Sequence, residues 1–383
     1  MRPSSIMWSI DLQIIILKYA VLFGFTFFFS LLLNRILLRF SKNLGKRSYN
    51  ESLVRWANEA KPSLGGISFF IIFLVTYSIY TIFFNFENNF LTFQYLGILG
   101  ATGTGFLMGL SDDAYNTNPA LKLSTQIFCG IILCSTGTYI SLFPVDLLNY
   151  AITILWVVAV MNSINMLDNM DGITTTVSIF IILMAIMTLF YSPDFAHFYL
   201  ALLLGTVSSL VAFLFFNWHP AKMFMGDTGS QFLGIFLASI GIIFFWNNKG
   251  LGGEEASAKQ ICIVLLAFII PISDTLTVII NRLRRGQAPY IGGKDHTTHH
   301  LSYLGLSDRT VALIFVGISL VSYGLLWISV KFIQPWNHIF TAIFIAYFLV
   351  VFGLLFGVTQ NRKAKIRFYE QERKRKRPSI KSN

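Results

Sequence analysis

Carboxylate, amide and histidine side chains gather in four short polar stretches of this 383-residue chain, between long apolar runs. The stretches cover residues 111–122, 162–172, 217–230 and 282–308. Side chains of these types bind divalent cations, phosphate groups and the polar edges of nucleotides. The four stretches therefore predict a site for a metal ion and phosphate, provided that the fold brings them together.

The first stretch carries Asp112 and Asp113 directly after an apolar run that ends at Gly109 and Leu110. On a helix, adjacent side chains point about 100° apart, so one carboxylate can face a metal ion while the other faces a second substrate. Adjacent like charges also repel each other. The structural alternative is a solvated helix end, and the pair alone does not exclude it.

The second stretch has polar side chains at intervals of three between apolar residues. They are Asn162, Asn165, Asp168 and Asp171, and Gly172 follows them. On a helical backbone this spacing forms one polar stripe. A stripe leaving an apolar helix needs partners such as Mg²⁺, a metal-bound phosphate or a uracil edge. A helix cap with a glycine turn is the alternative, although a cap does not need four polar groups.

The third stretch places Asp227 between Gly226 and Gly229, just before another apolar run. Glycines let the backbone approach a ligand closely, and the N-terminus of the following helix offers N–H groups to a phosphate. Asn217 and His219 stand at the end of the preceding run and are predicted to reach the same space. The alternative is that Asp227 only caps the helix.

The fourth stretch combines basic residues with a histidine-rich segment. The residues are Arg282, Arg284, Arg285, Asp295, His296, His299 and His300. Zinc is one interpretation, but hard-cation chemistry with oxygen ligands fits the other stretches better, so we interpret the histidines as hydrogen-bond donors to a diphosphate. The arginines are either determinants of membrane topology or phosphate contacts.

Asp274 stands apart from the four stretches, about two turns inside an apolar run. A carboxylate at this depth is expensive in a membrane, so we expect Asp274 to be functional or paired. A hydrogen bond that only helps helices to pack is the simpler alternative.

The elements that must position these residues are transmembrane helices. Hydrophobic residues make up 55% of the chain and charged residues only 12%, which is about half the charge of a soluble domain. Uncharged runs long enough to span a bilayer cover about 12–38, 64–85, 91–110, 123–142, 147–161, 173–191, 196–216, 229–246, 260–281, 309–331 and 335–358. We predict an all-α, polytopic membrane protein of about 11 transmembrane helices, with one membrane domain over residues 1–361 and a basic tail over 362–383.

Basic residues predict the orientation, because cytoplasmic loops carry an excess of Lys and Arg. With eleven spans, one set of loops holds Lys42, Lys46, Arg47, Arg55, Lys61, Lys122, Lys222, Arg282, Arg284, Arg285 and Lys294. The four polar stretches lie on that same side. We therefore expect the N-terminus outside, the C-terminus inside, and the site on the cytoplasmic face of the cell inner membrane. Anionic headgroups explain the net charge of +11 better than nucleic acid does.

Taken together, the stretches resemble the polyprenyl-phosphate N-acetylhexosamine-1-phosphate transferases, the family of the phospho-MurNAc-pentapeptide translocase and the GlcNAc-1-phosphate transferases. The resemblance rests on Pro62-Ser-Leu-Gly-Gly66, Asp112-Asp113, Asn162-x-x-Asn165-x-x-Asp168-x-x-Asp171-Gly172, Asn217 to Ser230, Pro271-Ile-x-Asp274-Thr275 and the histidine segment. The continuation from Leu301 to Asp308 looks more like the GlcNAc-1-phosphate type.

This resemblance implies that N-acetylhexosamine-1-phosphate, most simply GlcNAc-1-phosphate, passes from a UDP-sugar to polyprenyl (undecaprenyl) phosphate with release of UMP. The reaction would be the first membrane step of a cell-envelope glycan. The implied cofactor is Mg²⁺, with Mn²⁺ as a substitute. A phospho-MurNAc-pentapeptide transferase and a non-enzymatic lipid-linked transporter stay open as alternatives, and so does a homodimer.

The resemblance also implies roles for single residues. Asp227 would be the principal metal ligand, aided by Asp168, and Asp112 and Asp113 would act on the acceptor phosphate. The predicted catalytic set is completed by Asp171, His299 and His300. The predicted substrate-binding set is Asn162, Asn165, Asn217, Lys122, Arg285 and His296.

Overall fold

The computed structural model describes residues 4–43, 61–84, 92–193, 195–248, 258–288, 293–361 and 366, and within the first helix it describes the side chains of residues 12–41. Three basic residues used to predict the orientation lie outside these ranges, namely Lys46, Arg47 and Arg55. The predicted basic tail also lies outside them, apart from Ile366.

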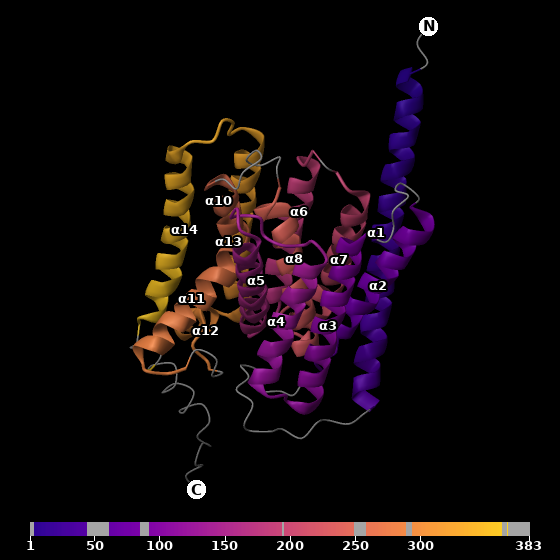
Figure 1. Ribbon diagram of the computed structural model, residues 1–383. Coiled ribbons are helices and arrows are strands. Elements are labelled where there is room, and N and C mark those ends of the chain that lie inside the picture. The colour runs from indigo at the N-terminus through magenta and orange to yellow at the C-terminus, as the bar shows by residue number, and fades with distance from the viewer. Residues whose placement is uncertain are drawn as a thin grey trace.

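The described ranges are built from helices (Figure 1). In chain order these are α1 (Ser4–Asn43), α2 (Gly65–Phe83), α3 (Phe93–Tyr115), α4 (Pro119–Ser135), α5 (Asp146–Leu167), α6 (Ile173–Phe190), α7 (His197–Asn217), α8 (Gly226–Gly241), the π-helix η1 (Ile242–Trp246), α10 (Ala258–Ala267), α11 (Ile269–Arg284), α12 (Thr297–Tyr303), α13 (Asp308–Lys331) and α14 (His338–Thr359). A single bridge between Ser63 and Phe224 is the extended pairing in these ranges.

Eight helices of the described chain are long and apolar enough to cross a membrane, so the prediction of an all-helical, multi-pass membrane protein is confirmed. They are α1, α2, α5, α6, α7, α8 continued by η1, α13 and α14. The pair α10 and α11, bent by 79°, makes a ninth if it counts as one span. The apolar helix α4 has only 17 residues, and α3 is diluted by glycine and threonine. The number eleven therefore stays a prediction.

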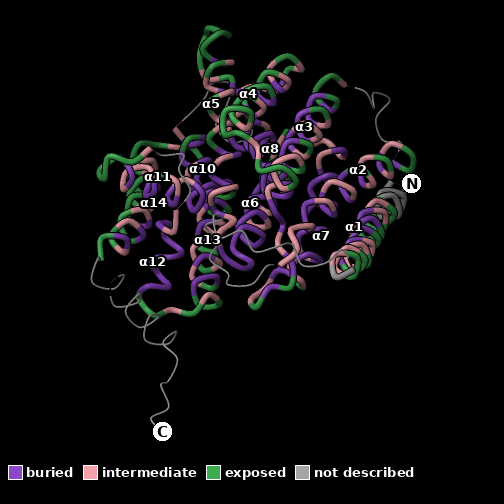
Figure 2. Tube along the Cα trace, turned by 90° about the horizontal axis from the view of Figure 1, so that it is seen from below, coloured by how far each residue is buried: buried purple, intermediate pink, exposed green. Residues whose placement is uncertain are grey.

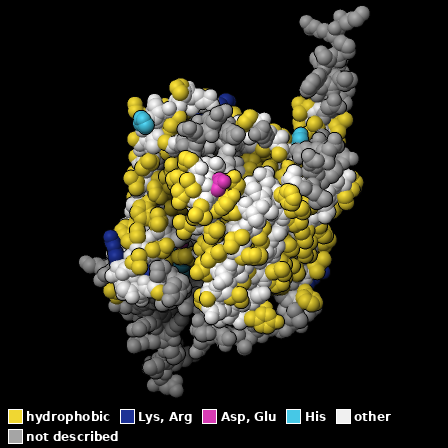
Figure 3. All heavy atoms as spheres, in the orientation of Figure 1, with side chains coloured by type: hydrophobic (Ala, Val, Ile, Leu, Met, Phe, Trp, Pro, Cys, Tyr) yellow, Lys and Arg dark blue, Asp and Glu magenta, His cyan; other side chains and the backbone are white. Residues whose placement is uncertain are grey.

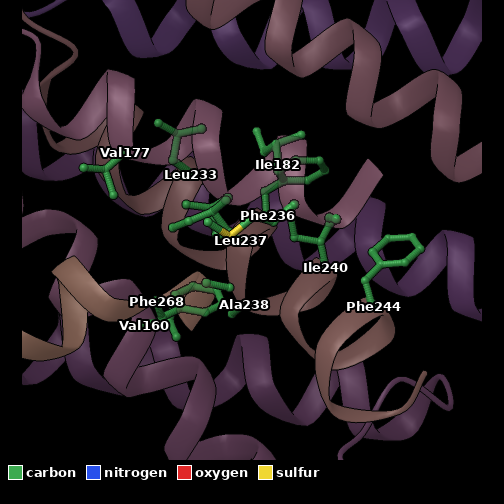
Figure 4. Packing of buried hydrophobic residues seen from close by; sticks show 14 of the residues in the cluster. Val160, Val177, Ile182, Leu233, Phe236, Leu237, Ala238, Ile240, Phe244 and Phe268 are labelled. Atoms are coloured by element: carbon green, nitrogen blue, oxygen red, sulfur yellow. The ribbon is translucent and has the colours of Figure 1, made fainter. Parts of the chain in front are cut away.

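The helix α8 lies in the middle of the bundle, while α1 and α14 lie on its rim (Figure 2). Every residue of α8 is buried except Asp227. Its apolar side chains pack against Val160 of α5 and against Val177 and Ile182 of α6 (Figure 4). The outer surface is largely apolar, as Figure 3 shows for one face. Lipid is as apolar as these side chains, so close packing and interhelical hydrogen bonds must hold the helices together.

Two glycines let neighbouring helices touch the first turn of α8 backbone to backbone. A Cβ atom on Gly66, at the start of α2, would lie 2.1 Å from the backbone nitrogen of Gly229. A Cβ atom on Gly109, near the end of α3, would lie 2.2 Å from the backbone oxygen of Asp227. These contacts fix the position of Asp227, the one residue of α8 that is not buried.

Candidate active site

Four helix ends meet at the lower end of the bundle in Figure 1, and Lys122 joins them. Its Nζ atom lies 2.9 Å from Asp112 Oδ2, at the end of α3, and 3.0 Å from Asp227 Oδ1, at the start of α8. Lys122 also donates to Asn165 Oδ1, near the end of α5, at 3.3 Å. We call Asp112, Lys122, Asn165 and Asp227 the Lys122 cluster.

Asp227 is the most exposed carboxylate of this cluster, with 29% of its side chain exposed against 11% for Asp112. Asn165 Nδ2 donates to Asp227 Oδ1 at 2.5 Å and to Ser230 Oγ at 2.8 Å. Asp227 Oδ2 accepts no hydrogen bond from the described part of the chain. The position of Asp227 in the first turn of α8 stabilises its negative charge. Its side chain points to Lys122 and Asn165, so the interpretation as a simple helix cap is wrong.

Asp112 and Asp113 contact different elements, as predicted for neighbours on a helix. Asp112 Oδ1 accepts hydrogen bonds from Thr117 N at 2.9 Å and Thr117 Oγ1 at 2.6 Å, which leaves Oδ2 for Lys122. Asp113 Oδ2 accepts from Thr228 N at 2.9 Å and Thr228 Oγ1 at 2.7 Å. Asp113 therefore fastens the end of α3 to the first turn of α8. The role of this pair on an acceptor phosphate stays a prediction.

The backbone around Asp113 requires a glycine at position 226. Gly226 has a φ of +73°, and a Cβ atom there would lie 2.5 Å from Asp113 Oδ2. A side chain would both strain the backbone and displace the carboxylate. The glycine that we expected to admit a ligand thus also admits Asp113.

The predicted single stripe from Asn162 to Asp171 is wrong, because α5 ends at Leu167. Gly172, with a φ of +74°, lies in the turn that starts α6. Asn165 belongs to the Lys122 cluster, whereas Asn162 Nδ2 donates to Gln126 Oε1 at 2.7 Å, between α5 and α4. Asp168 is the first residue after α5 and is half-buried. Residues that recur at one regular spacing in the sequence therefore contact different partners in the fold.

Asp171 and Asn217 hold the α5–α6 turn against the connection from α7 to α8. Asp171 Oδ2 accepts from Ala221 N at 2.9 Å and lies 3.0 Å from His219 Nδ1. Asn217 Oδ1 accepts from Gly172 N at 3.1 Å, and its Nδ2 donates to Met223 O at 3.1 Å. Asn217 is only 3% exposed. These bonds give both residues a structural task, and their contact with substrate stays a prediction.

The histidine segment joins the same end of the bundle through one buried and one partly buried hydrogen-bonded contact. Asp274 of α11 is 1% exposed, and its Oδ2 lies 2.8 Å from His296 Nδ1. Thr298 Oγ1 donates to Asn169 Oδ1, in the α5–α6 turn, at 2.6 Å. The expectation that Asp274 is paired is confirmed, and the four polar stretches do gather at one end of the bundle.

His299 and His300 differ in their surroundings from a pair of exposed phosphate donors. Burial, together with the charge of His296, lowers the pKa of His299 to about 3, so this ring is neutral at physiological pH. The His300 ring packs edge-on against Tyr303 at 5.3 Å between centroids. In the described ranges no group of three or more His, Cys, Asp or Glu residues is arranged to hold a metal ion, so zinc at this segment receives no support.

The arginines of α11 bind a carboxylate of the chain itself. Arg282 donates to both Asp295 oxygens, from Nη2 at 2.8 Å and from Nε at 3.1 Å. Arg285 Nη2 lies 2.6 Å from Asp295 Oδ2. Burial raises the pKa of Asp295, but the two arginines outweigh burial and hold this pKa at about 2. The contact of Arg285 with substrate stays a prediction, and the structure adds this ion pair to its possible roles.

Comparison with known proteins shows a similarity to one transferase family over part of the chain. Residues 95–245 match the sequence profile of glycosyl transferase family 4. We call residues 95–245 the family 4 region. The family 4 region contains the whole Lys122 cluster, while Pro62–Gly66 and α12 lie outside it. The resemblance stated from the sequence is confirmed over that region.

Several curated proteins are similar to the chain. A probable undecaprenyl-phosphate N-acetylglucosaminyl 1-phosphate transferase of Bacillus subtilis is 31% identical over 61% of this chain and 65% of its own length. A decaprenyl-phosphate N-acetylglucosaminephosphotransferase of Mycobacterium leprae is 29% identical over 59% and 62%. A phospho-N-acetylmuramoyl-pentapeptide-transferase of Staphylococcus saprophyticus is 27% identical over 70% and 85%. The chain thus matches 65% and 62% of the first two relatives, slightly less than two thirds of each.

The family 4 region has a donor set that suits Mg²⁺. Asp112 Oδ2 and Asp227 Oδ1 converge on one point, since Lys122 Nζ lies within 3.0 Å of both. Proteins commonly bind Mg²⁺ through one or two carboxylates and leave the other positions to water and substrate phosphates. The two carboxylates and the Asn165 amide oxygen fit such a site. The role of Asp168 as a second ligand stays a prediction.

Sequence reasoning missed the side chains that orient this cluster. Thr117 and Thr228 each donate two hydrogen bonds to one of the paired aspartates. Gln126 connects Asn162 of α5 with Gln231 of α8, to which it donates at 3.2 Å. A signal was present, since polar residues in apolar runs need partners, but the sequence does not say which partner each one finds.

Proposed function

We propose that the chain transfers GlcNAc-1-phosphate from UDP-GlcNAc to a polyprenyl phosphate and releases UMP. The Lys122 cluster carries this proposal, because it sets two carboxylates around one cation at the end of a membrane bundle. The cluster lies in the family 4 region, and two similar proteins are named for GlcNAc-phosphate transfer to polyprenyl phosphates.

The chemistry exchanges one phosphorus–oxygen bond for another. An oxygen of the acceptor phosphate attacks the phosphorus that carries the sugar, and the bond from that phosphorus to the bridging oxygen of UMP breaks. The acceptor is mostly dianionic at neutral pH, because its second pKa is about 6, so a general base has little proton to remove. The task of the protein is therefore to bring two anions together and hold the reacting oxygens in line.

Lys122 and the carboxylates divide this task. Mg²⁺, or Mn²⁺ in its place, would be held by Asp227 and Asp112 and would supply positive charge to the phosphates. Asn165 keeps Asp227 in place through its hydrogen bond to Oδ1. Lys122 offers a second positive charge that donor or acceptor phosphate can approach, since 18% of its side chain is exposed.

The location of the cluster fits substrates of different solubility. A cytosolic nucleotide sugar and a membrane-held phosphate meet only at the interface between bilayer and water. We infer eleven crossings, an N-terminus outside and a C-terminus inside, which puts the cluster at the cytoplasmic face of the inner membrane. An odd number of crossings agrees with Figure 1, where α1 begins at the top and α14 ends at the bottom.

A donor panel tests the proposal. Purified protein receives Mg²⁺, polyprenyl phosphate and one of several UDP-N-acetylhexosamines, and released UMP is measured. We expect UMP with UDP-GlcNAc and none after Asp227→Ala. Asp146→Ala is the matched control, because Asp146 is exposed at the opposite end of α5. Absence of UMP with every donor would refute the enzymatic proposal.

The panel also decides between the two transferase types. The Staphylococcus relative, aligned over 85% of its own length, favours including UDP-MurNAc-pentapeptide as a second candidate donor. A transporter would place its binding groups near the middle of the membrane. The Lys122 cluster instead lies at helix ends, which disfavours that alternative.

A further inference from the structure

Both carboxylate oxygens of Asp274 accept hydrogen bonds from the histidine segment. Its Oδ1 accepts hydrogen bonds from Thr297 N at 2.8 Å and from Thr297 Oγ1 at 2.6 Å. Its Oδ2 lies 2.8 Å from His296 Nδ1. The carboxylate is 1% exposed and the His296 side chain 7%, so solvent does not compete for these bonds. Asp274 therefore fixes both the start of α12 and the ring of His296.

The bond to Asp274 also decides which nitrogen of His296 carries a proton. A carboxylate only accepts hydrogen bonds, so His296 Nδ1 must be the donor. Nε2 then remains for a ligand and makes no hydrogen bond to the described residues. Nε2 donates to a phosphate oxygen only if it carries a second proton, so a ring that bridges Asp274 and a phosphate is an imidazolium, in which both nitrogens donate. The hydrogen-bond partner of one imidazole nitrogen sets the chemical behaviour of the other.

The ring is also held at a defined place relative to the Lys122 cluster. Thr298, two residues after His296, donates to Asn169 Oδ1 at 2.6 Å. Asn169 follows Asp168 and stands four residues after Asn165, the member of the cluster on α5. Hydrogen bonds from α11 and from the α5–α6 turn, the first buried and the second partly buried, thus hold the N-terminus of α12 at the cluster's end of the bundle.

We propose that Asp274 is a positioning residue that acts through His296 and presents its Nε2–H, in the imidazolium form, to a phosphate oxygen of the donor diphosphate. This rests on the proposed transfer from a UDP-sugar. If Asp274 only helped the helices to pack, any side chain that accepts the hydrogen bonds of Thr297 would be sufficient at this position. The additional bond to a histidine ring is what requires an acceptor-only side chain.

Asp274→Asn is the informative variant, because it keeps the size and still offers an oxygen to Thr297. Its amide would donate to His296 Nδ1. The ring would then be neutral with its proton on Nε2, and the hydrogen bond to the phosphate would lose the positive charge of the imidazolium. For histidines that bind metal ions, loss of such an outer partner costs about 10- to 100-fold in affinity or activity, and we use the same range for a histidine that contacts a phosphate. We expect kcat to fall by about that factor while KM changes little. Asp146→Asn, on the exposed residue at the other end of α5, is the matched control.

Two further measurements separate positioning from mere support. In a His296→Gln background, Asp274→Asn should cost less than about twofold more, because its effect passes through the missing ring. The ring ¹⁵N signals of His296 in histidine-labelled protein should change in Asp274→Asn. They should stay the same in Thr297→Val, which removes only the hydroxyl bond to the same carboxylate.

A full additional loss in the His296→Gln background, or unchanged ¹⁵N signals in Asp274→Asn, would overturn the inference. Wild-type protein that releases no UMP would instead overturn the proposed function. The ¹⁵N experiment needs no substrate, so it still decides whether Asp274 sets the protonation of His296.

Discussion

Replacing Lys122 by methionine should make the chain bind divalent metal more tightly while it loses transfer activity. In the structure the ammonium group stands where the oxygens of Asp112 and Asp227 converge, at 2.9 and 3.0 Å. A metal ion held by the same oxygens must displace it. Methionine keeps much of the length of the side chain and removes the competing charge.

The magnitude follows from the geometry and the exposure. At about 3 Å and an effective dielectric constant of about 20, each pair attracts by about 5 kcal/mol before desolvation is counted. The Lys122 side chain is 18% exposed and that of Asp227 29%, so solvent screens much of this attraction. An exposed pair retains up to about 1 kcal/mol of net interaction, so the two partly exposed pairs of Lys122 together retain about 1–2 kcal/mol, which corresponds to about 5- to 30-fold in metal affinity.

Titration of purified protein with Mn²⁺, followed by electron paramagnetic resonance, measures that affinity without substrate. We expect a dissociation constant about 5- to 30-fold lower in Lys122→Met than in wild type. Lys222→Met is the matched control, since Lys222 is exposed on the connection between α7 and α8. Weaker or unchanged Mn²⁺ binding in Lys122→Met would refute the reasoning that the ammonium and the metal share one place.

Three other perturbations test the supporting structure. Asp113→Ala removes both hydrogen bonds from Thr228. It should lower the free energy of unfolding by about 1–2 kcal/mol, as loss of a helix cap does. Thermal unfolding in detergent, compared with wild type, measures this change. Gly66→Ala should sharply reduce folded protein, whereas Gly317→Ala, where a Cβ meets nothing within 4 Å, should not; equal yields would contradict the proposed backbone contact. Because the pKa of Asp295 is held at about 2, below the ordinary value of about 3.9 for an aspartate, its ion pairs contribute stability that is fully present above about pH 4 and is lost as the pH falls toward 2. Asp295→Asn should therefore remove part of the loss of melting temperature that acid causes. The same dependence of melting temperature on pH in variant and wild type would argue against a stabilising role of the Asp295 ion pairs.

The sequence by itself determined that the helices of this protein lie in a lipid bilayer, and it determined the residue types of the site. Long uncharged runs are a local property, because each helix must satisfy its own backbone in lipid. They predicted helices that the structure contains, from α1 to α14. The basic and polar residues between the runs likewise predicted that Asp112, Asn165 and Asp227 would lie at one end of the bundle, and their contacts through Lys122 agree.

Only the tertiary structure decided which partner each polar residue has. Asn162 and Asn165 share a sequence period, yet one bonds to Gln126 and the other to Asp227, because α5 packs against different neighbours along its length. The same holds for Asp113, which caps α8, and for Asp274, which pairs with His296. A hydrogen bond joins side chains within about 3 Å. Between residues far apart in the chain, that distance is set by how whole helices pack, and no local pattern encodes it.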